Sequence, residues 1–288
     1  MIAYVKKVAQ QLAPLYTDKI QREQIVWWML EAITGKKEAE LIALKEPSAK
    51  AVDLLQEWIT KHVKQKMPLQ YLIGSVPFID ITIAVEPPVL IPRPETEEWV
   101  ANLITQMQTL ADKNITIFDL CTGSGVIALA LAHAFKQAVA IGTDIADHAL
   151  SVAQENKSNL KIPNVSFVKS DLFAALTGKK ADLIIANPPY INEADWQQLD
   201  PMVREWEDKD ALVASNNGLA LIEEIIRQAP AFLYNNTDFS KHQMGQLYIE
   251  IDYNQGSTVL NFMKRYFTHA DILKDYNGQD RVAVGYLS

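Results

Sequence analysis

Residues 115–144, ITIFDLCTGSGVIALALAHAFKQAVAIGTD, carry the strongest indication of the chain's fold class. It begins with an apolar run typical of a buried strand, turns through Gly123 and Gly125, continues as an apolar helix and ends in a second short apolar run. This order is the βαβ unit of a parallel sheet. Glycines at such a turn let the backbone approach a ligand closely at the carboxyl edge of the sheet.

Four further apolar runs along the chain have the same strand character: VSFVKSD, ADLIIANPP, QLYIEID and RVAVGYL. Helical stretches alternate with them, and this alternation predicts an α/β fold built on a largely parallel sheet. One more helix, around residues 257–266, precedes the last run. We expect that run to close the sheet as an antiparallel strand.

The first 65 residues have a different pattern, in which apolar residues recur at helical spacing. Gly35 and the pair Pro47-Ser48 divide this stretch into about four short helices, with Ser48 as the N-cap of the last. We expect Trp27 and Trp28 to lie in the core, because aromatic residues in a helical stripe are more often buried than exposed. A small all-helical domain is therefore predicted.

A strand-like alternation, FIDITIAV at residues 78–85, follows this helical stretch and leads into the proline-rich run EPPVLIPRPETEE at residues 86–98. We predict a β-hairpin linker, and then a helix that Pro94 and Thr96 open. The predicted organisation is a helical domain at residues 1–72, a hairpin linker at residues 73–92 and an α/β domain at residues 93–288.

Composition limits the classes of partner. The 288 residues carry a formal net charge of −8, and nucleic-acid binders usually depend on clustered Lys and Arg, so we expect no direct nucleic-acid binding. No run reaches the roughly 18 uninterrupted apolar residues of a membrane span, and one cysteine allows no internal disulfide. The scattered histidines predict no metal site. We therefore expect a cytoplasmic protein that neither spans a membrane nor holds a metal.

Three acidic or glycine-rich segments at strand ends indicate a nucleoside site. The CTGSG turn lacks both the dinucleotide fingerprint and the GK[ST] phosphate loop, which suits a ligand without phosphate. Asp144 ends the second strand, where a carboxylate can accept both hydroxyls of a ribose, and Asp171 with Leu172 would lie beside an adenine. Alternatively, Asp144 and Asp171 are only helix N-caps, but their succession after the glycine turn favours the ligand site.

The segment NPPY at residues 187–190 directly follows the buried run at residues 182–186. Two consecutive prolines cannot extend a strand ladder, so carbonyl groups are left unpaired at the carboxyl edge of the sheet. A planar NH2 group can then donate one hydrogen to the Asn187 side-chain oxygen and the other to the Pro188 carbonyl, with the Tyr190 ring on its flat face. Two acceptors would hold a poorly nucleophilic amide or amino nitrogen in line with a transferable methyl group.

These motifs together resemble the protein-(glutamine-N5) methyltransferases that modify peptide chain release factors. The matching stretches are QYLIG at residues 70–74, VLIPRPETE at residues 89–97, DLCTGSG, SDLF, NPPYI and DYNGQDRV. The resemblance implies a Rossmann-like class I methyltransferase domain with a mostly parallel seven-stranded sheet. It also implies S-adenosylmethionine as methyl donor, a helical domain that docks the release factor, and a GGQ glutamine as target. We expect the chain to be a monomer.

Site residues carry over by motif position. The resemblance implies that the cofactor is lined by Cys121, Thr122, Gly123, Ser124, Gly125, Asp144, Asp171, Leu172 and Asn187. It implies a glutamine pocket of Asn187, Pro188, Pro189 and Tyr190, with Asn187, Pro188 and Tyr190 in the catalytic role. Arg93 and Glu95 in the RPETE run are expected to shape that pocket. Cys121 stands where the family usually has glycine, and we interpret it as a small packing residue.

Three alternatives stay open at the level of sequence. An adenine-N6 methyltransferase acting on DNA or RNA would use the same NPPY segment on a flipped base, but it predicts a basic groove. A glutamine methyltransferase acting on a ribosomal protein would share nearly every motif. A non-catalytic binding protein that keeps the Rossmann-like domain would have no reason to retain NPPY.

Overall fold

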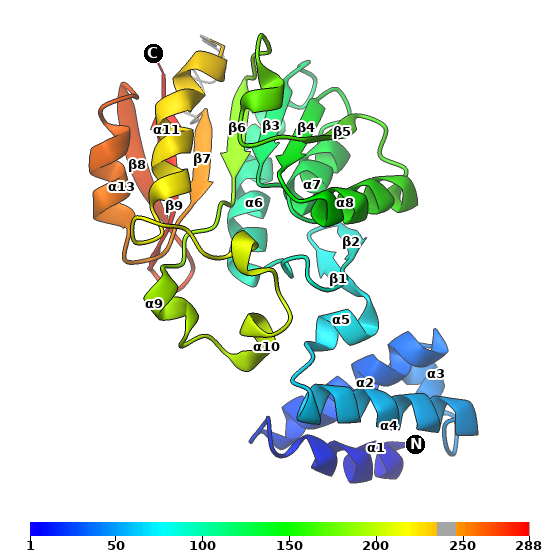
Figure 1. Cartoon of the computed structure of the whole chain (residues 1–288). Coiled ribbons are helices and arrows are strands. Elements are labelled where there is room, and N and C mark those ends of the chain that lie inside the picture. The colour runs from blue at the N-terminus through cyan, green and yellow to red at the C-terminus, as the bar shows by residue number, and fades with distance from the viewer. Residues whose placement is uncertain (235–245, 288) are drawn as a thin grey trace. The chain divides into compact units, whose positions relative to one another are not determined.

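A computed structural model describes residues 1–234 and 246–287 of the chain (Figure 1). The chain forms two compact units. The first unit comprises Met1–Ser75 together with Asp200–Trp206, and the second comprises Val76–Leu199 together with Glu207–Ser288. A hydrogen bond ties Asp200–Trp206 to the rest of the first unit: Trp206 Nε1 donates to the Gln65 carbonyl at 2.9 Å.

The first unit is entirely helical, as its apolar spacing predicts. Its helices are α1 (Ile2–Ala9), a 3-10 turn (Gln10–Leu12), α2 (Lys19–Thr34), α3 (Glu38–Ile42), α4 (Ala49–Lys64), α5 (Leu69–Ile73) and α10 (Pro201–Arg204). Gly35 ends α2 in the left-handed conformation, with a φ of 67°. Ser48 caps α4 by accepting a hydrogen bond from the Ala51 N–H at 3.3 Å. Both boundary predictions are confirmed.

The expected burial of the tryptophan pair is half wrong. Trp27 is 7% exposed and lies in the core of the helical unit, whereas Trp28 is 47% exposed. The reason is geometric, because α2 turns about 100° per residue and directs Val26, Met29 and Leu30 inward. The stripe thus includes Trp27 and leaves its neighbour at the surface.

The predicted hairpin is present at the boundary at Ser75: β1 (Ser75–Phe78) and β2 (Ile81–Ala84) form a two-stranded sheet. The hairpin is tied to helix α8 (Asp147–Leu160) by one side chain. Asn156 Oδ1 accepts from the Ala84 N–H at 2.6 Å and Asn156 Nδ2 donates to the Ala84 carbonyl at 3.0 Å. These paired bonds satisfy the edge of β2 as a neighbouring strand would.

The main sheet has seven strands among the described residues, in the order β5-β4-β3-β6-β7-β9-β8. The strands are β3 (Thr116–Leu120), β4 (Val139–Asp144), β5 (Val165–Lys169), β6 (Leu183–Ala186), β7 (Leu247–Glu250), β8 (His269–Lys274) and β9 (Asp280–Tyr286). The first five in this order pair parallel, and β9 pairs antiparallel with both β7 and β8. The predicted Rossmann-like sheet and its antiparallel end are confirmed.

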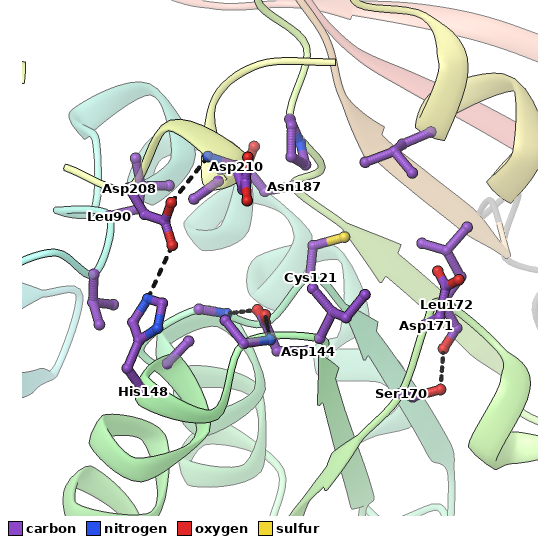
Figure 2. A pocket seen from close by; sticks show the side chains of 18 residues that line it. Leu90, Cys121, Asp144, His148, Ser170, Asp171, Leu172, Asn187, Asp208 and Asp210 are labelled. Atoms are coloured by element: carbon purple, nitrogen blue, oxygen red, sulfur yellow. Dashed lines mark hydrogen bonds and ion pairs between the residues drawn. The ribbon is translucent and has the colours of Figure 1, made fainter. Parts of the chain in front are cut away.

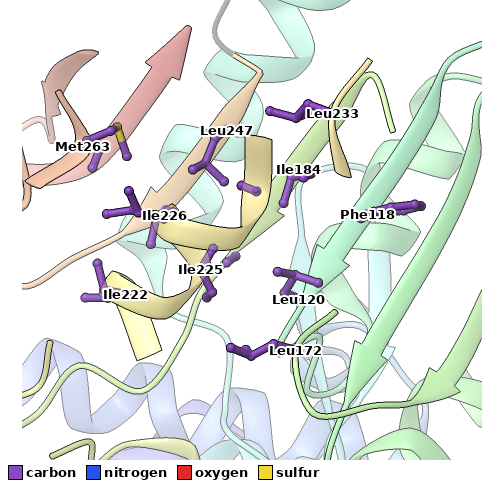
Figure 3. Packing of buried hydrophobic residues seen from close by; sticks show 14 of the residues in the cluster. Phe118, Leu120, Leu172, Ile184, Ile222, Ile225, Ile226, Leu233, Leu247 and Met263 are labelled. Atoms are coloured by element: carbon purple, nitrogen blue, oxygen red, sulfur yellow. The ribbon is translucent and has the colours of Figure 1, made fainter. Parts of the chain in front are cut away.

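Helices cover both faces of this sheet. Helices α7 (Val126–Ala134) and α8 pack against β3, β4 and β5, and α6 (Pro94–Met107) packs beside α7. On the other face, α11 (Ala220–Phe232) and α13 (Gly256–Met263) cover the apolar cluster that Figure 3 shows. In that cluster Ile222, Ile225 and Ile226 of α11 meet side chains of β3, β6 and β7. Alternate residues of each strand therefore face opposite helical layers.

The register aligns the carboxyl ends of the three central strands. Leu120, the last residue of β3, lies opposite Thr143 of β4 and Ala186 of β6. The next residues along the chain, Cys121, Asp144 and Asn187, therefore leave the sheet at the same level. This edge is where ligands bind in open α/β sheets. In the part of the chain that the structure describes, no helix is long and apolar enough to cross a membrane.

Candidate active site

The buried carboxylate of Asp119 holds the glycine loop between β3 and α7 in place. Asp119 Oδ2 accepts hydrogen bonds from Thr122 Oγ1 at 2.6 Å and from the Ala128 N–H at 3.1 Å. Asp119 is fully buried, and burial raises the pKa of its carboxyl to about 7. Thr122 is also anchored, because its N–H donates to the Thr143 carbonyl at 2.9 Å. These contacts fix the loop against both neighbouring elements.

The two glycines of the loop serve different purposes. Gly125 has a φ of +79°, and a Cβ there would lie 2.6 Å from the Phe167 ring, so this glycine permits close packing inside the unit. Gly123 has a φ of +55°, and a Cβ there would meet nothing within 4 Å. Its bare face thus opens toward the space beside the loop, where a ligand can approach the backbone.

Cys121 adopts a φ of 56°, the left-handed region that favours glycine. This explains in physical terms why a glycine suits this position. Burial and the neighbouring Asp144 raise the pKa of the Cys121 thiol far above its ordinary range. The thiol is therefore protonated and a poor nucleophile, which agrees with its interpretation as a packing residue.

Asp144 at the end of β4 holds two backbone N–H groups. Its Oδ2 accepts from Gly123 at 2.9 Å and its Oδ1 accepts from Ala146 at 3.0 Å. Ala146, and not Asp144, is the N-cap residue of α8, so Asp144 is more than a helix cap. Each carboxylate oxygen has two acceptor positions, and one on each oxygen remains for a further donor such as a ribose hydroxyl.

A cavity lies at this edge of the sheet, and Figure 2 shows the side chains that line it. Of the residues expected to bind the cofactor or the substrate, it brings together Cys121, Gly123, Asp144, Asp171, Leu172, Asn187 and Pro189. Thr122, Ser124, Gly125, Pro188, Tyr190, Arg93 and Glu95 are not among its lining residues. Thr122, Ser124 and Pro188 are instead buried behind the wall of the cavity.

Asp171 and Leu172 reach the cavity through a tight turn after β5. Leu172 has a φ of 43°, and its carbonyl accepts a hydrogen bond from Ser170 Oγ at 2.8 Å. The same Ser170 Oγ accepts from the Ala175 N–H at 2.9 Å. The serine thus caps the turn, and the side chain of Asp171 is left to face the cavity, as Figure 2 shows.

The NPPY segment follows β6, and contacts with Gln255 and Gly218 hold it in place. The Tyr190 carbonyl accepts a hydrogen bond from Gln255 Nε2 at 3.1 Å. Gly218 packs so closely that a Cβ there would lie 1.9 Å from the same carbonyl oxygen. Ile191 continues as a β-bridge to Val213. The segment is therefore rigid where it meets the cavity.

Side chains of the NPPY segment have distinct surroundings. Asn187 and Pro189 face the cavity, while Pro188 is buried. The Tyr190 hydroxyl donates to Glu250 Oε1 at 3.4 Å, and burial followed by the charge of Glu250 raises the pKa of Tyr190. No hydrogen bond to the Pro188 carbonyl is present within residues 1–234 and 246–287. Asn187 thus lines the cavity, and the role of the Pro188 carbonyl as a second acceptor stays a prediction.

Arg93 and Glu95 take different positions. Arg93 Nη2 donates to both carboxylate oxygens of Glu207, at 2.9 and 2.7 Å. Glu207 directly precedes Asp208, which lines the cavity. The ion pair with Arg93 therefore holds the backbone next to a residue of the cavity wall. Glu95 lines a second hollow between α6 and the β8–β9 strands, away from the glycine loop.

Comparison with known proteins identifies the family. A family model described as the methyltransferase small domain matches residues 100–205. A Bacillus anthracis protein named release factor glutamine methyltransferase is 35% identical over 279 residues, which cover 95% of this chain and 90% of the relative. A Fusobacterium nucleatum protein of the same name is 36% identical over 232 residues, 80% of this chain and 63% of that relative.

The chain belongs to the release factor glutamine methyltransferase family. Among solved structures, the 16S rRNA N2 methyltransferase RsmC of T. thermophilus, in complex with AdoMet and guanosine, is similar in fold. It matches with a TM-score of 0.53 at 16% identity, over 74% of this chain and 50% of that chain. At this identity the match shows the class I methyltransferase fold alone.

The cavity of this chain is also lined by residues that the sequence motifs do not indicate. They are Val89, Leu90, Ile145, Ala146, His148, Ala149, Ser170, Asp208, Asp210, Ala211 and Leu221. His148 Nε2 lies 3.2 Å from Asp208 Oδ2, and the Asp208 N–H donates to the Pro88 carbonyl at 2.8 Å (Figure 2). The proline-rich run signals the first two residues. No local pattern signals Asp208, because its place depends on contacts with residues 60 or more positions away.

Proposed function

We propose that this methyltransferase transfers a methyl group from S-adenosylmethionine to the side-chain amide nitrogen, N5, of the glutamine in the GGQ motif of a peptide chain release factor. The observation that carries the proposal is a pair of acceptors in adjacent residues: the Asn187 side chain, which lines the cavity, and the Pro188 carbonyl, which accepts no hydrogen bond within the described residues. An amide NH2 has two hydrogens, and this pair matches them. The shared name of the relatives supports the choice of substrate.

The residues around the cavity fit the proposed cofactor. Gly123 leaves open space where a Cβ would project, and the Asp144 carboxylate keeps acceptor positions for two ribose hydroxyls. Asp171 and Leu172 supply a polar and an apolar contact for an adenine edge. When bound, S-adenosylmethionine supplies an electrophilic methyl group on a sulfonium. We assign Cys121, Gly123, Asp144, Asp171 and Leu172 to its binding, with Thr122, Ser124 and Gly125 shaping the loop.

The chain's own residues orient the substrate nitrogen. Asn187 Oδ1 and the Pro188 carbonyl accept the two amide hydrogens, which fixes the nitrogen in position and stabilises positive charge that develops there. Tyr190 packs against the flat face of the amide, and its raised pKa keeps the hydroxyl neutral. No strong general base is required if the amide proton leaves after transfer.

In the same proposal the helical unit docks the release factor, and the chain acts as a cytoplasmic monomer without direct nucleic-acid contacts. The net charge of −8 supports a protein substrate over a polyphosphate one. Arg93 shapes the wall of the cavity through Glu207. The role of Glu95 stays a prediction.

The test is methyl transfer from labelled S-adenosylmethionine to a purified bacterial release factor. We expect labelling of the wild-type factor, loss of label with a GGQ Gln→Ala factor, and loss of label with Asn187→Ala enzyme. An unlabelled factor, together with labelling of a ribosomal protein, DNA or RNA, would contradict the substrate assignment.

A further inference from the structure

A buried chain of hydrogen bonds lies behind Asn187. Asn187 Nδ2 donates to Thr96 Oγ1 at 3.4 Å, and Thr96 Oγ1 donates to Glu250 Oε2 at 2.7 Å. Thr96 belongs to the first turn of α6 and Glu250 is the last residue of β7. Thr96 is 2% exposed and Glu250 is 1% exposed, so water does not compete for the hydrogen bond between them, whereas Asn187 is only partly buried and lines the cavity.

The direction of this chain follows from chemistry. The Glu250 oxygen that meets Thr96 is an acceptor, so the single hydroxyl hydrogen of Thr96 points to Glu250. Only lone pairs of Thr96 Oγ1 are left for Asn187, and an amide oxygen there would be repelled. Asn187 must therefore present its NH2 group to Thr96, which turns its Oδ1 the opposite way.

Glu250 remains an acceptor toward Thr96 in either protonation state. Burial raises the pKa of its carboxyl, while hydrogen bonds from Trp99 and Thr96 oppose that shift. Oε2 accepts from both Trp99 Nε1, at 2.8 Å, and Thr96, whereas Oε1 faces the Tyr190 hydroxyl. A proton on the carboxyl would reside on Oε1, so Oε2 keeps its two donors.

A purely structural role explains these residues poorly. The N-cap residue of α6 is Arg93, and the Thr96 hydroxyl bonds a side chain of β7 instead of the helix backbone. A buried carboxylate costs free energy that apolar packing would avoid. The chain of hydrogen bonds ends at Asn187, the side chain whose orientation matters to an NH2 substrate.

We propose that Glu250, acting through Thr96, is a positioning residue that fixes the orientation of the Asn187 amide so that Oδ1 faces the methyl-accepting NH2 group. The inference rests on the proposed function and deepens it. With the opposite orientation, Asn187 would present two hydrogens to a substrate NH2, and one acceptor would become a repulsive donor. At 3.4 Å this contact is longer than a typical N–H···O hydrogen bond, so its contribution to the stability of the fold is small.

The test compares Thr96→Val, which has nearly the same shape but no hydroxyl, with Thr96→Ser, which keeps the hydroxyl. We expect Thr96→Val to lower kcat by about 10- to 100-fold, with KM for the release factor and Kd for S-adenosylhomocysteine within about twofold of wild type. Thr96→Ser should keep kcat within about threefold of wild type. Equal loss of kcat in the two variants, or a matching loss of cofactor affinity in Thr96→Val, would mean that Thr96 only packs.

A second readout does not need the reaction. The side-chain amide resonances of Asn187, identified by their loss in Asn187→Ala, should show slowed hydrogen exchange in wild type and Thr96→Ser but not in Thr96→Val. Identical exchange in all three proteins would overturn the proposal. If wild-type enzyme labels no release factor, the proposed function fails, and the exchange experiment still decides the orientation of Asn187.

Discussion

Arg93 and Glu207, 114 positions apart in sequence, form an ion pair in which one guanidinium nitrogen donates to both carboxylate oxygens. The Glu207 side chain is 1% exposed, whereas the Arg93 side chain is 30% exposed. Burial raises the pKa of Glu207, and the charge of Arg93 opposes that shift. The pair connects the RPETE run to the segment that carries Asp208 and Asp210 into the cavity.

Removal of Arg93 should therefore destabilise the catalytic unit. Arg93→Ala leaves a buried carboxylate without its partner, and we expect a loss of about 1–3 kcal/mol in the free energy of unfolding. Affinity for S-adenosylhomocysteine should fall with it, because the wall at Asp208 loosens. Thermal unfolding and calorimetric titration measure the two effects. Lys209→Ala is the control, since its pair with Glu193 is exposed and should contribute less than about 1 kcal/mol.

Asp144 offers a direct test of the cofactor assignment. Asp144→Asn keeps the size of the side chain but removes acceptor positions, so it cannot hold two backbone N–H groups and two hydroxyls together. We expect Kd for S-adenosylhomocysteine to rise at least about tenfold, equivalent to 1.4 kcal/mol. The control is Asp147→Asn, an exposed carboxylate three residues on that pairs with Lys169. Unchanged affinity in Asp144→Asn would remove the carboxylate from the cofactor site.

Gly218 tests whether the NPPY segment must be held in place. Gly218→Ala would place a Cβ 1.9 Å from the Tyr190 carbonyl oxygen, so the segment must shift. We expect kcat to fall by about 100-fold, as when a reacting group is displaced by about 1 Å, with cofactor affinity nearly unchanged. Gly178→Ala is a matched control, because Gly178 has a similar φ of +80° but no atom within 4 Å of the added Cβ. Equal effects of the two substitutions would indicate backbone strain alone.

Asp119 should make stability depend on pH in a predictable direction. Its folded-state pKa of about 7 lies above the ordinary value of 3.8, so the folded state holds the proton more tightly. The difference in free energy of unfolding between wild type and Asp119→Asn then favours wild type most below pH 3.8. It falls by about 1.4 kcal/mol per pH unit up to about pH 7 and is constant at higher pH. Urea unfolding of both proteins between pH 5 and 9 measures this difference. A difference that does not change with pH would show that Asp119 titrates normally.

Local sequence patterns are sufficient to predict the elements that carry the candidate site. The glycine turn, the carboxylate of Asp144 and the NPPY segment are each adjacent to a strand with a strong apolar pattern, and the structure places all of them at one edge of the sheet. Strand β8 was not recognised from its sequence. It is the edge strand, and HADILK has exposed His269, Leu273 and Lys274 at its ends, so its apolar signal is weak.

The class of fold, the order of the elements and the residues that follow each central strand can all be read from the amino-acid sequence, because they depend on apolar periodicity and backbone chemistry within a few residues. The side chains that support these residues become known only from the folded chain. Thr96 and Glu250 are 154 positions apart, and Arg93 and Glu207 are 114 apart. Such contacts depend on which elements become neighbours in space, as β6 and β7 do, and no local pattern encodes that.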